Sequence, residues 1–112
     1  MLAPHHVMTE TEFNTKVDEV LLDIEQLLEA ADVDADFESG EGILQISFPG
    51  GGKLIVNRQA VNQEIWVAAR SGGYHFAWKE DGWYGTRDGR ELFVVLSECA
   101  SQQSGKTVII GN

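Results

Sequence analysis

Residues 29–39 read EAADVDADFES, and within this stretch a helical sequence pattern gives way to a strand pattern. Acids fall on alternate positions from residue 32 to residue 38, and Val33, Ala35 and Phe37 lie between them. Side chains alternate between the two faces of a β-strand. If residues 33–38 are extended, the three apolar side chains therefore point into the protein and the acids point to solvent.

The segment before this stretch is typical of an amphipathic helix of about five turns. Thr9 and Glu12 match a capping box, in which each side chain satisfies a free backbone amide at the helix start. Apolar residues then recur every three or four positions; they are Phe13, Val17, Leu21, Ile24 and Leu28, with Val20, Leu27 and Ala31 widening the stripe. The spacing predicts that one face of this helix packs on a core.

After the quoted stretch, short β-like runs alternate with turn residues. The runs cover residues 43–48, 53–59, 64–70, 74–79 and 83–86, and glycine recurs in most of the turns between them. Such close turns are typical of an antiparallel meander. A second helix is predicted to be capped at Asp88, with Glu91 in its first turn, and to end near Ser104 and Gly105. We expect residues 107–110 to pack back against the domain.

This order of elements predicts an α+β fold. The simplest arrangement is a two-layer α/β sandwich of helix, antiparallel sheet of about six strands and helix, with both helices on one face of the sheet. The 112 residues suffice for one core, and residues 9–112 read as a single domain. We assign residues 1–8 to an N-terminal extension in which Met8 is a candidate start, and we expect His5 and His6 to belong to a leader rather than to a metal site.

The formal net charge of −10 is concentrated in one part of the chain. Residues 9–41 hold twelve acids and one base, and the remainder is nearly neutral. This imbalance argues against nucleic acid as a partner, because phosphates require a basic footprint. It favours cations or basic protein surfaces.

The composition also bears on the compartment. Cys99 is the single cysteine and shares a helical stripe with Leu92 and Leu96, so we predict a buried structural thiol. A lone cysteine cannot form an internal disulfide, which fits a reducing cytosol. No apolar run approaches the ~18–20 residues of a membrane span, and the first residues lack a secretory signal pattern. We therefore expect a cytoplasmic protein that does not cross a membrane.

The alternating acids Asp32, Asp34, Asp36 and Glu38 lie where the predicted helix meets the predicted first strand. Carboxylate oxygens suit hard cations such as Fe²⁺, Fe³⁺, Mn²⁺, Mg²⁺ and Ca²⁺. The spacing is not that of an EF-hand, so we expect an exposed, water-rich and weak site. The alternative interpretation is a solvated acidic face that serves only solubility.

A second candidate surface lies on the predicted strands. Trp66 falls on the outward side of its run together with Arg70, and Asn57 and Gln59 fall on the outward side of the preceding run. An exposed tryptophan beside amides and an arginine is a candidate anchor for a partner protein. The alternative is that Trp66 packs under its neighbours on the same face. His75 is expected to point outward without a role.

Catalysis finds little support in the sequence. There is no nucleophile elbow, phosphate loop, dinucleotide motif or metalloprotease motif. A di-iron site that oxidises iron typically uses Glu-x-x-His, which does not occur. We therefore expect no enzyme activity and rank ferroxidase chemistry low.

Four blocks of the sequence together resemble the bacterial frataxins, also called CyaY proteins. The blocks are Asn57-Arg58-Gln59, Ile65-Trp66-Val67-Ala68, Ser71-Gly72-Gly73-Tyr74-His75-Phe76 and Gln102-Gln103-Ser104-Gly105. The acidic helix that leads into residues 32–38 is also similar, so that the resemblance covers about residues 10–108. It implies a frataxin-like fold.

The resemblance also implies weak binding of Fe²⁺ or Fe³⁺ on an acidic ridge, where other divalent cations can substitute. The implied ligands are Glu25, Glu29, Asp32, Asp34, Asp36 and Glu38, with Asp18, Glu19 and Asp23 further up the helix. Gln26 and Ala30 interrupt the acids at the helix end, where bacterial members tend to carry adjacent acids. The implied partner contacts are Asn57, Gln59 and Trp66.

From the residues and the resemblance we expect a protein of iron–sulfur cluster assembly. In this hypothesis it binds iron and modulates a complex of a cysteine desulfurase with its scaffold protein. We expect a monomer that metal can drive into oligomers. The alternative is a metal-independent acidic adaptor that docks on a basic partner protein.

Overall fold

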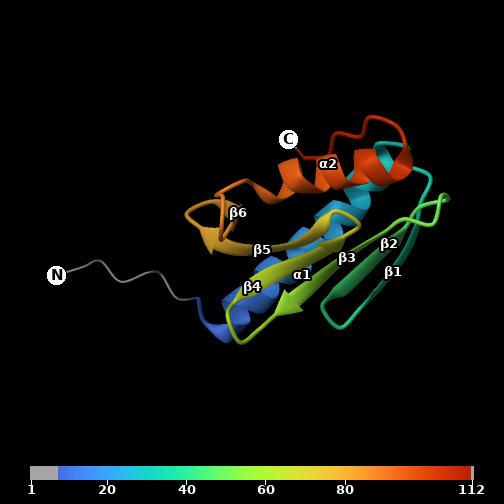
Figure 1. The fold of residues 1–112 in the computed structure, drawn as a ribbon. Coiled ribbons are helices and arrows are strands. Elements are labelled where there is room, and N and C mark those ends of the chain that lie inside the picture. The colour runs from blue at the N-terminus through green and yellow to red at the C-terminus, as the bar shows by residue number, and fades with distance from the viewer. Residues whose placement is uncertain (1–7, 112) are drawn as a thin grey trace.

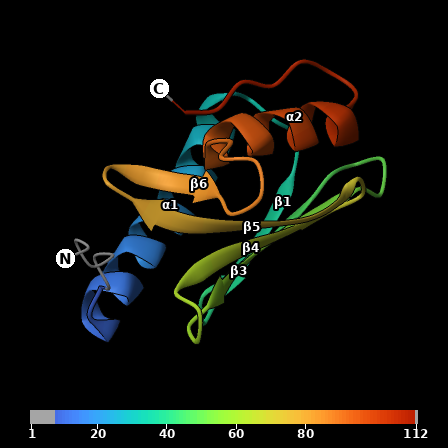
Figure 2. The same cartoon turned by 60° about the vertical axis from the view of Figure 1, so that its left-hand side comes forward.

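The computed structural model describes residues 8–111. Helix α1 (Glu10–Ala30) is followed by β1 (Asp36–Gly40), β2 (Ile43–Ser47), β3 (Lys53–Gln59), β4 (Glu64–Ala69), β5 (Gly72–Lys79) and β6 (Gly82–Gly85), and then by α2 (Leu92–Ser104). The six strands form one sheet in the order of the chain, and every neighbouring pair is antiparallel. Both helices cover one face of this sheet and leave the other open (Figures 1 and 2). The predicted α/β sandwich is confirmed.

Helix α1 begins as its sequence predicts. The Thr9 hydroxyl accepts a hydrogen bond from the backbone N–H of Glu12 at 3.0 Å, and the Glu12 carboxylate accepts one from the N–H of Thr9 at 2.8 Å. The buried side chains of α1 are Phe13, Val17, Val20, Ile24 and Leu28. They meet the inward-facing side chains of the strands, among them Leu44, Ile46, Leu54, Val56, Ile65, Val67 and Phe76. The core therefore joins a helical stripe to alternate strand positions.

The first strand starts three residues later than the alternating acids suggest. Asp32 has a φ of 58°, and Val33 donates its backbone N–H to the carbonyl of Leu28 at 3.3 Å. This left-handed residue ends α1, and the N–H of Val33 is used by the helix end rather than by the sheet. The sheet ladder begins only at Asp36, which pairs with Ser47. Val33 is nevertheless buried, so the expected inward direction of its side chain is confirmed.

The two ends of the domain also differ in part from the expectations. Met8, assigned above to the extension, is buried in the core, and its carbonyl accepts a hydrogen bond from the Gln63 amide at 2.6 Å. Residues 1–7, with His5 and His6, lie outside the described residues. Helix α2 is capped by Glu91, whose side chain accepts from the N–H of Val94, whereas Asp88 had been expected to cap it.

The C-terminal segment packs back along α2 as expected. Val108 and Ile110 are buried, and two serines one helical turn apart bind their backbone. The Ser101 hydroxyl donates to the carbonyl of Val108 at 3.0 Å and accepts from its N–H at 2.8 Å. The Ser97 hydroxyl contacts the carbonyl and N–H of Ile110 in the same way. We call this pair of serines, with the segment that it holds, the serine clasp.

We predict that Ser101→Ala lowers the free energy of unfolding by about 1–3 kcal/mol, because both backbone groups of Val108 lose their partner in a half-buried place. Urea unfolding would measure the loss, and amide hydrogen exchange should accelerate at Val108. Ser39→Ala is the matched control, since Ser39 is exposed on β1 and its hydroxyl has no hydrogen-bond partner among residues 8–111. Equal effects of the two substitutions would contradict a role for the clasp.

Candidate metal- and partner-binding surfaces

The packing of α1 divides the predicted metal ligands into two groups. Asp18 and Glu25 lie on the flank of α1 that faces the turn between β1 and β2, where they line a hollow of about 240 Å³. Glu19 and Asp23 lie on the opposite flank and line a separate groove beside the β5–β6 hairpin. The nine predicted ligands therefore do not form one ridge.

The predicted ligands in the second half of α1 and after it lie along the end of the helix and the edge of the sheet. We use the name acidic ridge for Glu25, Glu29, Asp32, Asp34, Asp36 and Glu38. All of these except the half-buried Glu25 are exposed, and no ion pair is found for any of them within residues 8–111. Asp18 differs, since its carboxylate lies 3.7 Å from the guanidinium of Arg58.

Within the described residues, no group of three or more His, Cys, Asp or Glu side chains is placed to hold a metal ion. The ridge thus offers carboxylate oxygens along a line, without a preformed pocket. Such a line can contribute one or two oxygens to a hydrated cation, with water completing the shell. The prediction of a weak and open site stays a prediction.

The position of β1 gives its acids a second physical role. β1 pairs only with β2 and so forms an edge of the sheet. Asp36 and Glu38 lie opposite Ser47 and Gln45 on this strand. Charged side chains on an edge strand discourage pairing with another chain. Edge protection is therefore a structural explanation for part of the ridge.

The open face of the sheet carries a row of polar and aromatic residues at its centre. Asn57, Trp66 and His75 lie directly opposite one another on β3, β4 and β5. The rings of Trp66 and His75 stack with centroids 4.3 Å apart and an interplanar angle of 7°. The indole N–H of Trp66 donates to Glu64 Oε1 at 2.8 Å, and His75 Nδ1 lies 3.8 Å from the same oxygen. The hydrogen bond to Glu64 thus orients the indole of Trp66, and the imidazole of His75 stacks on that ring.

This unit joins predicted and unpredicted residues. Trp66 was expected as a contact residue, whereas Glu64 and His75 were missed. Glu64 lies two residues before Trp66 on the same strand, so strand alternation could have indicated it, whereas His75 meets Trp66 only through the register of β4 with β5. Gln59 is the last residue of β3 and lies opposite Glu64 on β4. Its side-chain oxygen accepts a hydrogen bond from the backbone N–H of Val61 at 3.2 Å. Arg70, also expected here, instead lies in the turn after β4 with its guanidinium beside Gly52, at the opposite end of β3. It does not belong to this surface.

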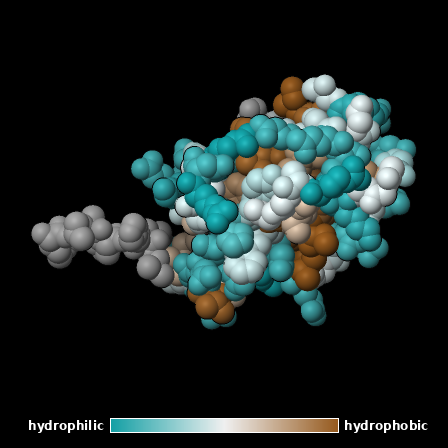
Figure 3. Space-filling view, viewed as in Figure 1, coloured by the Kyte–Doolittle hydropathy of each residue, from teal (hydrophilic) through white to brown (hydrophobic). Residues whose placement is uncertain are grey.

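The remaining surface features are less specific. Figure 3 shows a mostly hydrophilic surface in the view of Figure 1, with hydrophobic residues in small separate groups.

Cys99 is buried as predicted, and its burial raises the pKa of the thiol. In the part of the chain that the structure describes, neither helix has the length and apolar composition that a membrane span requires.

Sequence comparison with known proteins finds relatives that share one family. Residues 6–106 match the family model of the frataxin-like domain. The iron–sulfur cluster assembly protein CyaY of Dechloromonas aromatica (strain RCB) is 46% identical over 104 residues, which cover 92% of this chain and 99% of the relative. The protein of the same name from Paraburkholderia phymatum is 46% identical over 92% of this chain and 98% of its own.

Comparison with solved structures finds members of the same family. The frataxin of Psychromonas ingrahamii superposes with a TM-score of 0.87 at 30% identity, over 94% of this chain and 100% of its own. A trimeric frataxin of Saccharomyces cerevisiae, solved in complex with ferrous iron, gives a TM-score of 0.65 at 28% identity, over 94% of each chain.

We predict that Glu64→Ala releases the Trp66 indole. Its N–H loses an acceptor, so the indole resonance should shift upfield and exchange faster with solvent in two-dimensional NMR spectra. Glu64→Gln retains a side-chain carbonyl oxygen and should keep most of the wild-type signal. Glu80→Ala removes a carboxylate from the β5–β6 turn and is the matched control. An unchanged Trp66 resonance in Glu64→Ala would show that the stack alone fixes the ring.

Proposed function

The chain belongs to the frataxin-like family and acts in iron–sulfur cluster assembly; we propose that it does so by binding ferrous or ferric iron weakly on the acidic ridge and by modulating a cysteine desulfurase–scaffold complex. The yeast relative solved with ferrous iron supports the choice of metal. The proposed role needs no catalytic step, and it suits a monomer in the cytoplasm that metal can drive into oligomers.

The observation that carries the proposal is the line of mostly exposed carboxylates along the end of α1 and the edge strand, which form no ion pair among residues 8–111. Alternate residues on a strand lie ~6.6–7 Å apart. Two like charges at that distance repel by ~0.6 kcal/mol in bulk water and by ~2.5 kcal/mol at an effective dielectric constant of 20. A bound divalent cation would relieve this repulsion. Hard oxygen ligands in an open arrangement favour iron that is held loosely and released.

The ridge and the open sheet face are suited to different parts of a partner. The ridge fits a basic groove of a desulfurase, by charge complementarity. The row of Asn57, Trp66 and His75 fits a surface of low charge, with Trp66 as its anchor. We propose that iron on the ridge lowers its negative charge and so changes the strength of desulfurase docking, while the sheet face contacts the scaffold protein.

The metal-independent adaptor remains the second candidate. The absence of three converging ligands among residues 8–111 favours it. In that case the ridge serves docking alone, and iron leaves docking unchanged.

An anaerobic titration with Fe²⁺, followed by backbone amide NMR, tests iron binding. We expect selective broadening of resonances at residues 25–38, because the paramagnetic ion would sit on the ridge. Asp34→Asn/Asp36→Asn should abolish the effect on β1. Glu10→Gln/Glu80→Gln removes the same charge elsewhere and should leave it intact. If both double variants reduce the broadening equally, the iron is held only as a diffuse counterion and the ridge is not a binding site.

Docking to a cysteine desulfurase tests the second half of the proposal. Binding should weaken as salt rises, since exposed charges are screened over ~8 Å at physiological ionic strength. Trp66→Ala should weaken assembly with the scaffold by at least about tenfold, the usual loss at an aromatic anchor, and should leave the iron titration unchanged. Iron-insensitive docking that still depends on salt would favour the adaptor.

A further inference from the structure

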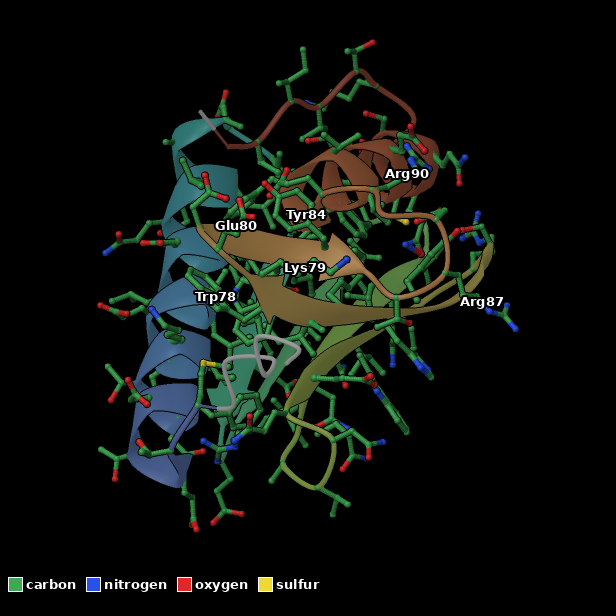
Figure 4. The ribbon with its side chains drawn as sticks, turned by 90° about the vertical axis from the view of Figure 1, so that its left-hand side faces the viewer. Trp78, Lys79, Glu80, Tyr84, Arg87 and Arg90 are labelled. Atoms are coloured by element: carbon green, nitrogen blue, oxygen red, sulfur yellow. The ribbon has the colours of Figure 1, made fainter. Side chains whose placement is uncertain are left out.

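A groove of about 520 Å³ separates α1 from the β5–β6 hairpin. This volume falls within the range of ligand-binding clefts, roughly 300–1,000 Å³. Its walls come from α1, from the hairpin and from the residues that begin α2 (Figure 4). The ridge described above begins at Glu25 on the other flank of α1 and continues to β1, so that this groove is a separate feature.

The floor of the groove is aromatic and already holds a cation of the protein itself. The Lys16 ammonium lies over the Trp78 ring, 4.1 Å from its centroid. Trp78 also packs edge-on against the buried Trp83, with centroids 5.5 Å apart and an interplanar angle of 75°. The Trp78 ring thus rests against the core through Trp83 and carries the Lys16 ammonium over one face, at a distance typical of a cation–π contact.

Both walls of the groove are negative. Glu19 and Asp23 come from α1 and form no ion pair with any residue of the described chain, and Asp81 and Glu91 face them. The Tyr84 hydroxyl donates to Asp81 at 3.2 Å. The charge of Asp81 and this hydrogen bond raise the pKa of Tyr84, and Glu91 adds to the effect. Among the described residues that line the groove, Lys16 is the one base beside these four acids.

We propose that this groove binds the guanidinium group of an arginine in a basic segment of a partner protein. The guanidinium stacks on Trp78 in place of the Lys16 ammonium, and its N–H groups donate to acids of the two walls. Arginine suits this place better than lysine, because its planar group stacks on an aromatic face while it donates several hydrogen bonds. The groove volume of about 520 Å³ leaves room for the residues that flank the arginine.

The first test is an NMR titration of the full chain with the peptide acetyl-Gly-Arg-Gly-amide at 150 mM salt. We expect shifts at the Trp78 indole and at residues 81–84. The matched probe contains citrulline, which has the shape of arginine without its charge, and should cause no shift. Equal effects of the two peptides would overturn the proposal. If free agmatine binds as tightly as the peptide, the ligand of the groove is a small organic cation, and the proposal of a partner segment is wrong.

Variants separate this site from the overall negative charge. Glu19→Gln/Asp81→Asn should weaken peptide binding about fivefold, whereas Asp34→Asn/Asp36→Asn removes the same charge from the ridge and should leave it unchanged. Lys16→Met vacates the face of Trp78 and should strengthen binding about threefold. Equal weakening by both double variants, or no gain in Lys16→Met, would refute the groove. Because none of these readouts involves iron or the desulfurase, they are independent of the function proposed above.

Discussion

The burial of one stripe of α1 on the sheet determines how the charged surface is arranged. Phe13, Val17, Ile24 and Leu28 are all within the core. Each such side chain contributes about 1.5–3 kcal/mol when it is fully buried, so the helix cannot rotate about its axis without a large loss. Once that stripe is fixed, the acids on its two sides face different neighbours. The division into a ridge and a groove follows from the core.

The ridge combines two physical demands on the same carboxylates. An edge strand must avoid pairing with other chains, and like charge along β1 achieves this at the expense of mutual repulsion. The same repulsion makes the edge receptive to a cation or to a basic surface. A function in metal or partner binding and a function in solubility therefore need not exclude each other, and only a comparison at constant total charge can separate them.

Local patterns in the sequence were sufficient for the elements of the fold and for the direction of most side chains. The capping box, the helical stripe and the strand alternation all depend on residues close together in the chain. The missed features depend on long-range geometry. The split between Asp18 and Glu19 requires the direction in which α1 packs, and the stacking of His75 on Trp66 requires the register of β4 with β5. The displacement of Arg70 arises because β4 ends before it, a boundary that alternation alone does not define.

The fixed orientation of Trp66 on the open sheet face has a consequence for the kinetics and entropy of recognition. A free tryptophan side chain on a surface samples several rotamers, and a partner that captures it must remove that freedom at about 0.5–1.5 kcal/mol. Here the indole is held by Glu64 on one side and by the imidazole of His75 on the other. The conformational entropy has been lost during folding, before any partner arrives. A lock-and-key encounter, rather than an adjustment after contact, is the behaviour that such a pre-organised ring favours.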